Sequence, residues 1–373
     1  MVNFNKPPFT GKEFDYMKDA LSRGKISGDG FYTKQCEIQL SQITKSNVLL
    51  TTSCTHSLEM VALLEDFSNS DEILVPAFTF VSSALAYNKF GCKVKFVDVD
   101  PLSGMSSLRH YRTQVSSSTR AIVLVHYGGK ISEDVEIIAD FCKENNIILI
   151  EDAAQAVGVR LNGKHAGTFG DYGAISFHET KNITSGGEGG ALIIANDISF
   201  EKAFTVRDKG TNRRAFFKGM VDKYSWRSKG SSYVMADLNA AYLFAQIENL
   251  DRINSFRRSA YEYYYQGLIE LEQKNILKLV PLNGGNGHMF YILFPKRDEL
   301  LVHLRSNNIE ATFHYLPLNN SDYVEKSSHI FDTDIHTLGT YDISRQIIRL
   351  PLYFGITKIC QDKVISAVKS YFQ

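Results

Sequence analysis

Lys181 is the residue of this chain best suited to covalent chemistry. It lies in the segment 176–182 (SFHETKN), which follows an apolar run and precedes the glycine-rich turn 185–190 (SGGEGG). Desolvation between buried strands lowers the pKa of a lysine, and the neutral amine is then a nucleophile that forms imines. Ser176 could hold a phosphate, and the glycines let the backbone pass close to a flat ligand. Alone, such a lysine is more often a surface residue, so its neighbours carry the argument.

Two carboxylates, Glu151 and Asp152, end the apolar run 147–150 about 30 residues before Lys181. A buried carboxylate is costly unless a cation or hydrogen-bond donors meet it. A protonated pyridine nitrogen is one such cation, and an ionised Asp152 beside it would keep the ring electron-withdrawing. A capping aspartate or a Mg²⁺ ligand explains the same residues equally well.

A third polar segment, 51–55 (TTSCT), ends another apolar run and leads into a helical pattern. Free backbone N–H groups and hydroxyls at a helix N-terminus suit a phosphate. An ordinary Ser/Thr cap of the helix accounts for the segment as well. Ligands of open α/β sheets bind beyond the carboxyl ends of the strands, so we expect all three polar segments to meet in one site.

The elements that position these segments alternate between strands and helices from about residue 45 to 195. Short β-branched runs end in polar or glycine-rich residues and are followed by helical spacing, clearest over 57–65 and 132–145, which is typical of α/β proteins. Seven runs predict one mostly parallel sheet that is buried on both faces. These runs are 48–52, 72–76, 94–99, 121–126, 147–152, 172–177 and 190–195.

A smaller second domain is predicted after a long helical region at 235–271, in which the stretch 236–249 has the spacing of a core-packing helix. Hairpin-like strands and further helices follow in the C-terminal part. We therefore expect a large domain over 1–250 and a small α/β domain over 251–373. The absence of a linker rich in Pro, Gly or Ser favours two closely packed domains with a cleft between them.

The composition favours a globular cytoplasmic protein. The chain has 373 residues, 44% of them hydrophobic, with 41 basic and 41 acidic side chains. This balance indicates no nucleic-acid or membrane partner, so an anionic ligand needs a local site. Five cysteines without CxxC spacing argue against disulfides and a zinc site, and we expect no metal. We expect neither a signal peptide nor a membrane span.

Over nearly its whole length the sequence resembles the DegT/DnrJ/EryC1 family of sugar aminotransferases, fold-type I enzymes that depend on pyridoxal 5'-phosphate (PLP). Within the family it is most similar to members that aminate C4 of dTDP-4-keto-6-deoxyglucose. The matching strings are FNKPP at 4–8, SGDG at 27–30, SCT at 53–55, PAFTF at 76–80, EDAAQ at 151–155, SFHETKN at 176–182, KGTNR at 209–213, VDKYSWR at 221–227 and FHYLPL at 313–318.

The resemblance implies cofactor roles for the matching residues. Lys181 would bond to PLP through an imine and shuttle protons, and Asp152 would hold the pyridine nitrogen. Pyridoxamine 5'-phosphate (PMP) would be the form between the two half-reactions. The other cofactor contacts would be Phe80 on the ring, Gln155 near its phenolic side, and Cys54, Thr55, Ser176 and Ser232 around the phosphate.

The resemblance also implies a dTDP-linked ketosugar and L-glutamate as substrates. His178 and Glu179 lie near enough to Lys181 to contact substrate, although loop packing explains them too. The basic cluster Lys209, Arg213, Lys223 and Arg227 would suit a diphosphate, or form a solvated face. His314 and Tyr315 end a predicted strand, where a ligand role and a core role are both open.

Family members are homodimers, and the loop corresponding to 230–236 reaches into the partner's site, so we expect the same here. This loop carries Ser232 where many relatives have Asn, and 318–320 (LNN) replaces a more usual Leu-His. The expected product is a dTDP-4-amino-4,6-dideoxyhexose for O-antigen or a related surface polysaccharide. A 3-ketosugar aminotransferase and a non-catalytic regulator on the same fold are the alternatives. Lys181 argues against the dehydratase branch, which has His there.

Overall fold

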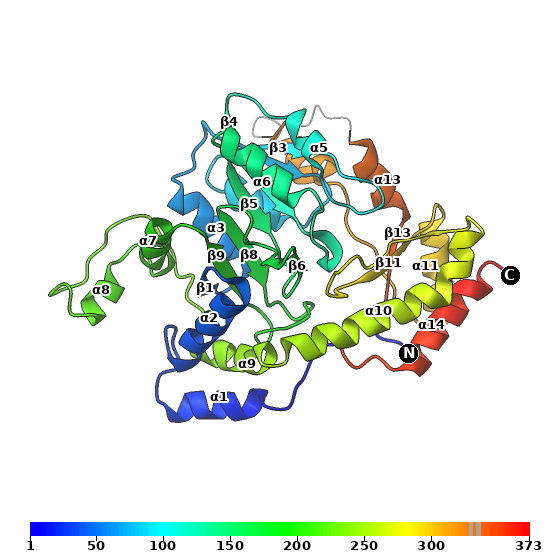
Figure 1. The fold of residues 1–373 in the computed structure, drawn as a ribbon, viewed down its shortest axis with the longest axis horizontal. Coiled ribbons are helices and arrows are strands. Elements are labelled where there is room, and N and C mark those ends of the chain that lie inside the picture. The colour runs from blue at the N-terminus through cyan, green and yellow to red at the C-terminus, as the bar shows by residue number, and fades with distance from the viewer. Residues whose placement is uncertain (328–330, 333–336) are drawn as a thin grey trace.

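The computed structural model describes residues 1–327, 331–332 and 337–373, and its centre is one large twisted sheet (Figure 1). Its strand order is β1-β9-β8-β5-β4-β2-β3-β12. Neighbouring strands are parallel except where β9 runs against β1 and β8. The strands are β1 (Asn47–Thr51), β2 (Glu72–Pro76), β3 (Lys93–Val97), β4 (Thr119–Val125), β5 (Ile148–Asp152), β8 (Tyr172–Ser176), β9 (Gly190–Ile194) and β12 (Phe331–Asp332).

All seven predicted strands are therefore confirmed, with bounds shifted by at most two residues. The eighth strand, β12, was not predicted, because a pair of residues carries no periodic signal. It comes from the C-terminal part of the chain and pairs with β3, and Phe331 stacks on Phe96 with ring centroids 5.8 Å apart. The C-terminal part of the chain thus extends the edge of the large sheet.

Both faces of the sheet are buried, as the continuous apolar runs predict. Successive strand residues point to opposite faces, so each strand feeds two cores. Ile73 and Val123 pack with helices α3 (Cys54–Leu64) and α4 (Ser82–Asn88) on one face. Leu74 and Ile122 pack with α6 (Val135–Glu144) on the other. The sheet is therefore a rigid support for the loops at its carboxyl edge.

The long helical region at 235–271 is two helices rather than one: α9 (Asp237–Ile247) and α10 (Leu250–Gln273). Asn249 lies between them, with φ −108° and ψ 9°, and its side-chain amide donates to the carbonyl of Ala245 at 2.9 Å. Asparagine side chains compete in this way with the helical backbone, which explains the break. Figure 1 shows α10 running from the large sheet to the C-terminal elements.

The C-terminal part has its own three-stranded antiparallel sheet, in the order β10-β11-β13. The N-terminus lies against this part of the chain, because Val2 forms an isolated bridge with Ile309, outside the sheet. The first half of α10 packs under the large sheet through Ile253, and its second half packs in the C-terminal core through Tyr264. The elements here are β10 (Lys278–Leu279), β11 (Phe290–Leu293), α11 (Arg297–Ser306), α12 (Asp322–Lys326), α13 (Leu338–Gln346), β13 (Ile347–Leu350) and α14 (Lys358–Ser370). The boundary at residues 250–251 stays a prediction.

The remaining elements surround the large sheet or project from it. Helix α8 extends away from the body of the molecule (Figure 1). No helix among the described residues is both long enough and apolar enough to cross a membrane. These elements are α1 (Glu13–Ser22), α2 (Phe31–Thr44), α5 (Leu108–Arg112), the short hairpin β6 (Arg160–Leu161) and β7 (Lys164–His165), α7 (Asp197–Arg207) and α8 (Arg213–Phe217).

Candidate active site

The three polar segments predicted to form a site do meet at one edge of the sheet. β1, β5 and β8 run in the same direction, so their carboxyl ends lie together. In the register of the sheet Ser176 is opposite Gly190. A Cβ on Gly190 would lie 2.4 Å from the backbone nitrogen of Cys54, so the absence of a side chain there lets the start of α3 approach the strand ends.

The adjacent carboxylates Glu151 and Asp152 point to different surroundings. Glu151 accepts hydrogen bonds from the backbone N–H groups of Gly167, Phe169 and Gly170 at 2.8, 2.5 and 2.7 Å. Its other contact is His126 Nε2 at 2.7 Å. Glu151 is thus a fully bonded structural carboxylate.

Asp152 is buried with fewer partners and remains available to a ligand. One oxygen accepts from Ser83 Oγ at 2.6 Å, and the other accepts from the backbone N–H of Ala154 at 3.1 Å. A carboxylate has about four lone-pair positions, so these bonds leave acceptor capacity free. This arrangement suits a cationic ring nitrogen better than it suits a metal, because no group of three His, Cys, Asp or Glu side chains in the described part of the chain could hold one.

Lys181 lies in the loop between β8 and β9, held by a backbone bond from its N–H to the carbonyl of His178 at 2.9 Å. Burial lowers the pKa of Lys181 below its usual value, and Cys54 and Asp152 partly oppose this effect. A larger fraction of the amine is therefore neutral, which is the form that attacks a carbonyl group.

The start of α3 combines an ordinary Ser cap with free N–H groups that suit a phosphate. Ser53 caps the helix, with its side chain accepting from the N–H of His56. The N–H groups of Cys54 and Thr55 have no partner among the described residues, and the positive helix end favours an anion there. Burial raises the pKa of the Cys54 thiol well above its usual value, so it stays neutral and does not repel a phosphate.

Aromatic side chains from both parts of the chain form a wall near this helix end. Phe80 and Tyr315 have ring centroids 6.2 Å apart, and Tyr315 also contacts Tyr127. Gln155 donates to the hydroxyl of Tyr315 at 3.2 Å and accepts from the N–H of Gly128 at 2.7 Å. Burial raises the pKa of Tyr315 to about 12, so its hydroxyl remains protonated.

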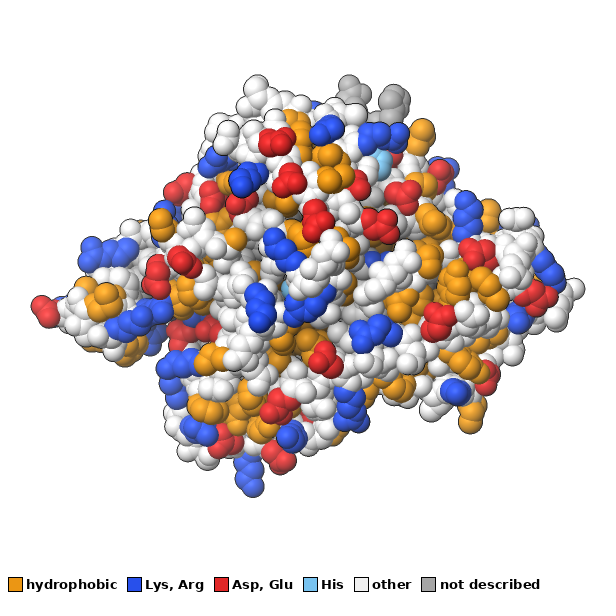
Figure 2. Space-filling model, in the orientation of Figure 1, with side chains coloured by type: hydrophobic (Ala, Val, Ile, Leu, Met, Phe, Trp, Pro, Cys, Tyr) orange, Lys and Arg blue, Asp and Glu red, His pale blue; other side chains and the backbone are white. Residues whose placement is uncertain are grey.

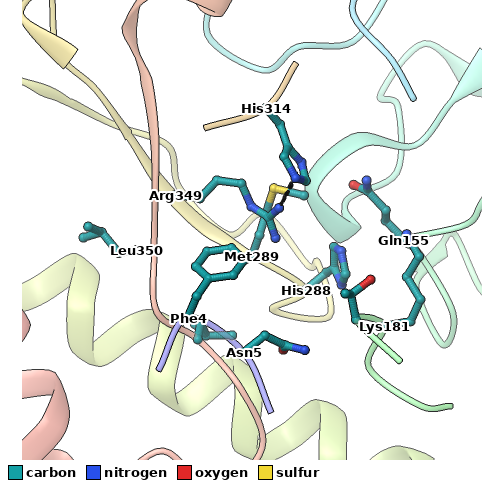
Figure 3. A pocket seen from close by; sticks show the side chains of 11 residues that line it. Phe4, Asn5, Gln155, Lys181, His288, Met289, His314, Arg349 and Leu350 are labelled. Atoms are coloured by element: carbon teal, nitrogen blue, oxygen red, sulfur yellow. Dashed lines mark hydrogen bonds between the residues drawn. The ribbon is translucent and has the colours of Figure 1, made fainter. Parts of the chain in front are cut away.

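A cavity of about 110 Å³ opens beside Lys181 (Figure 3). Gln155 and Lys181 line it from the large sheet, and His314 lines it from the C-terminal part. The residues that sequence reasoning did not single out are Phe4, Asn5, Thr180, His288, Met289, Arg349, Leu350 and Leu352. Arg349 gave one usable signal, since it is a charged residue inside the apolar run 347–350.

His178 and Glu179 lie on the outer side of the Lys181 loop. His178 Nδ1 contacts the hydroxyl of Thr180 at 2.9 Å, and Nε2 lies 3.6 Å from Glu188. Glu179 is exposed. These contacts explain the local loop structure, and neither side chain lines the cavity, so their substrate roles stay predictions.

The basic cluster is not brought to the cavity within one chain. Lys209 and Arg213 lie 2.9 and 3.8 Å from the carboxylate of Asp208, next to the projecting helix α8. Lys223 and Arg227 are exposed on the same projection, and so is Ser232 on the return strand. Binding of a diphosphate by these residues therefore stays a prediction.

The donor set fits PLP. An anion-binding helix end, a buried carboxylate with spare acceptor capacity, a lysine amine of lowered pKa and an aromatic wall lie around one edge of the sheet. Cys54, Thr55 and Ser176 would hold the phosphate, Asp152 the pyridine nitrogen and Lys181 the aldehyde carbon. An α/β fold with these groups defines the class of PLP-dependent enzymes.

Comparison with known proteins places the chain within this class. The model of the DegT/DnrJ/EryC1/StrS aminotransferase family matches residues 9–369. The chain therefore belongs to this family of PLP-dependent sugar aminotransferases.

Two curated relatives are similar over the whole chain. A GDP-perosamine synthase of Vibrio cholerae is 27% identical, covering 100% of this chain and 99% of the relative. A dTDP-4-dehydro-2,3,6-trideoxy-D-glucose 4-aminotransferase of Saccharopolyspora spinosa is 26% identical over 100% and 96% of the two chains. Both names refer to nucleotide-linked sugars, and the nucleotides differ.

Solved structures show the same fold. An aminotransferase from Streptoalloteichus hindustanus has a TM-score of 0.91 and 25% identity, covering 100% of this chain and 99% of that one. A Bacillus subtilis protein solved with bound PMP has a TM-score of 0.86 and 24% identity over 97% and 82% of the two chains.

Proposed function

We propose that this protein transfers the amino group of L-glutamate to C4 of dTDP-4-keto-6-deoxy-D-glucose, with PLP as cofactor. The product is a dTDP-4-amino-4,6-dideoxyhexose for O-antigen or a related surface polysaccharide. The enzyme works in the cytoplasm as a homodimer. The choice of this sugar substrate is supported by the matching strings at 176–182, 209–213, 221–227 and 313–318. It is also supported by the dTDP-sugar 4-aminotransferase among the relatives.

One observation carries the enzymatic part of the proposal. The amine of Lys181, with its lowered pKa, and the available carboxylate of Asp152 lie at the same edge of the sheet, beside the start of α3, whose N–H groups suit an anion. A structural or regulatory protein has no need to keep a desolvated lysine and a partly bonded buried aspartate next to each other, because each costs folding stability.

Each residue has a definite task in the reaction. PLP, when bound, supplies an electron sink for the carbanion formed at the reacting carbon. Asp152 keeps the pyridine nitrogen protonated, and the N–H groups at the start of α3 anchor the phosphate. Lys181, once its amine is released, takes the proton from the donor and returns one to the sugar carbon. Phe80 is 57% exposed in a single chain, so its ring is available to stack on the cofactor.

The experiment is an assay of purified enzyme with PLP, L-glutamate and either dTDP-4-keto-6-deoxyglucose or a GDP-linked 4-ketosugar. Formation of the dTDP-linked 4-amine supports the proposal, and the NMR couplings of H4 separate the galacto from the gluco product. Turnover of the GDP sugar alone would reassign the nucleotide. Release of 2-oxoglutarate without any sugar product would support the aminotransferase activity and contradict the proposed sugar substrate.

Lys181→Ala is the variant that tests the mechanism. We expect turnover to fall by at least about ten-thousandfold, because both the nucleophile and the proton shuttle are lost. PLP should still bind, since the phosphate and ring contacts remain. Lys164→Ala, at an exposed lysine of the β6–β7 hairpin, is the control and should keep full activity. Activity retained in Lys181→Ala would contradict the assignment.

A further inference from the structure

Arg349 is a buried cation without an anionic partner. It lies on β13, is 7% exposed, and its Nε atom has no hydrogen-bond partner. Among residues 1–327, 331–332 and 337–373, no carboxylate lies within salt-bridge distance of it. Its guanidinium lies against the ring of His314, with Nη1 2.9 Å from Nδ1, and over the ring of Phe4 at 4.7 Å. A buried unpaired charge is costly, so its retention calls for a ligand.

The titratable groups around Arg349 are basic side chains and protonated tyrosines. Burial lowers the pKa values of Lys181, His288 and His314, and the positive charge of Arg349 adds a smaller lowering to each. Arg257 is buried close by and donates to the carbonyls of Gly287 and His288. Burial, followed by Arg349, lowers the pKa of His314 to about 2, so this imidazole stays neutral and accepts from the guanidinium. The cavity therefore favours an anion.

Arg349 lies at the end of the cavity that is opposite Lys181. Figure 3 shows Arg349 and His314 on one side of the cavity and Lys181 and Gln155 on the other. The cavity volume of about 110 Å³ is smaller than the roughly 300–1,000 Å³ of pockets for drug-sized ligands. A small molecule with an amine at one end and a carboxylate at the other fits this arrangement.

We propose that Arg349, supported by His314, binds a carboxylate of the amino-acid donor and so orients the donor amine toward Lys181. Guanidinium groups pair with carboxylates through two parallel hydrogen bonds, and the free Nε and the outer Nη atom have this geometry. This inference deepens the proposed function and rests on its donor half-reaction, although it does not depend on which sugar is used. Sugar hydroxyls are neutral and would leave the charge of Arg349 uncompensated.

Binding of glutarate to the PLP-loaded enzyme tests the proposal without turnover. Glutarate has two carboxylates and no amine, so it binds without reacting. By calorimetry we expect Arg349→Met to raise its Kd about 10- to 100-fold. Arg349→Lys should give an intermediate value, because it keeps the charge and loses the planar pair. Arg345→Gln, at an exposed arginine four residues earlier, is the matched control and should bind as the wild type does.

A purely structural role of Arg349 would give a different result. Removal of an unpaired buried charge should leave the Tm of Arg349→Met equal to or above that of the wild type, while glutarate binding is lost. The proposal would be overturned if the Tm of Arg349→Met fell strongly and Arg349→Lys bound glutarate as tightly as the wild type does. Should Arg349→Met not fold, the Kd of Arg349→Lys decides the question.

The kinetics of the two half-reactions distinguish a role of Arg349 in donor binding from a role in sugar binding. In Arg349→Met the KM for glutamate in the donor half-reaction should rise at least 10-fold, and the KM for ketosugar with PMP-loaded enzyme should change much less. The reverse result would assign Arg349 to the sugar or its diphosphate and overturn the proposal. A wild-type enzyme that converts glutamate to 2-oxoglutarate but uses no dTDP-ketosugar would instead contradict the proposed sugar, and it would leave the glutarate result valid.

Discussion

Glu151 and Asp152 are neighbours in the chain, yet their surroundings give them separate tasks. Strand residues alternate between the faces of a sheet, and here β5 ends with one carboxylate turned to backbone donors of the loop 167–170 and the other turned to Ser83. By position and spacing the two residues are equivalent acids, and only the family resemblance selects Asp152. Their hydrogen-bond partners distinguish a structural carboxylate from one that is free to serve the proposed reaction.

Substitution of each carboxylate by its amide should separate these tasks. We expect Glu151→Gln to lower the free energy of unfolding by about 3 kcal/mol, because backbone donors lose a charged acceptor. Asp152→Asn should change stability by less than about 1 kcal/mol and lower kcat by at least about 100-fold, since the pyridine nitrogen loses its anionic partner. Urea unfolding and the assay described above measure both effects. Equal loss of stability in the two variants would refute the distinction.

The approach of helix α3 to the strand ends is the feature that matters at the scale of elements. Only glycine at position 190 leaves room for the start of this helix, because a Cβ there would lie 2.4 Å from Cys54 N and from the Ser53 carbonyl carbon. The start of the helix, which we propose to hold the phosphate, is thereby placed beside the lysine loop. The geometry of the proposed phosphate site depends on this contact.

Gly190→Ala should therefore displace the start of α3 and weaken PLP binding. We expect the Kd of PLP, measured by fluorescence titration of the apoenzyme, to rise more than about 10-fold, which corresponds to about 1.4 kcal/mol. Gly267→Ala, in α10, is the control, because its Cβ would meet only the side chain of the half-buried Ile365, whose end can move. Similar Kd values for the two variants would show that the close approach of α3 is not needed.

The β6–β7 hairpin gives a pH dependence of stability. His165 is buried at the end of β7, accepts from the N–H of Gly158 at 2.8 Å, and burial lowers its pKa from 6.5 to about 4. Between about pH 4 and 6.5 the unfolded chain binds a proton there that the folded chain does not. The contribution of His165 to stability is therefore complete above this window and is lost as the pH falls through it.

On going from pH 7 to pH 5, the wild type should lose about 2 kcal/mol more unfolding free energy than His165→Gln does. The variant starts less stable, because it loses hydrogen bonds, but its dependence on pH is flatter. Urea unfolding at the two pH values measures the difference. Parallel losses in both proteins would mean that His165 does not titrate as expected.

At the scale of the whole molecule, the rest of the described chain leaves the projection around α8 uncovered. Phe217, Met220 and Trp226 are large apolar side chains on it, and Trp226 is 82% exposed. Figure 2 shows charged side chains of both signs spread over the face in view rather than one charged patch. Exposed aromatic residues on this projection fit the proposed homodimer, in which the loop 230–236 that follows it reaches the partner's site.

Trp226 is the single tryptophan of the chain and can report on this interface. We expect its fluorescence emission to lie at short wavelength at high protein concentration and to shift to the red on dilution, as the dimer dissociates and water reaches the ring. Sedimentation velocity over the same concentrations gives the matching change in mass. A monomer at all concentrations with a fully red-shifted emission would contradict the dimer.

The sequence by itself determined the α/β class, the seven strands of the large sheet, and Lys181 and Asp152 as the main candidates for the site. These features are local, because strand periodicity, polar strand ends and contiguous motifs are all written in neighbouring residues. The tertiary structure alone decided that β12 joins the sheet, that Asn249 divides the long helix, and that His288 and Arg349 line the cavity with Lys181. The strand pairing and the cavity join residues more than about a hundred positions apart, and the helix break depends on the direction of one side chain. No periodic pattern along the sequence indicates either kind of contact.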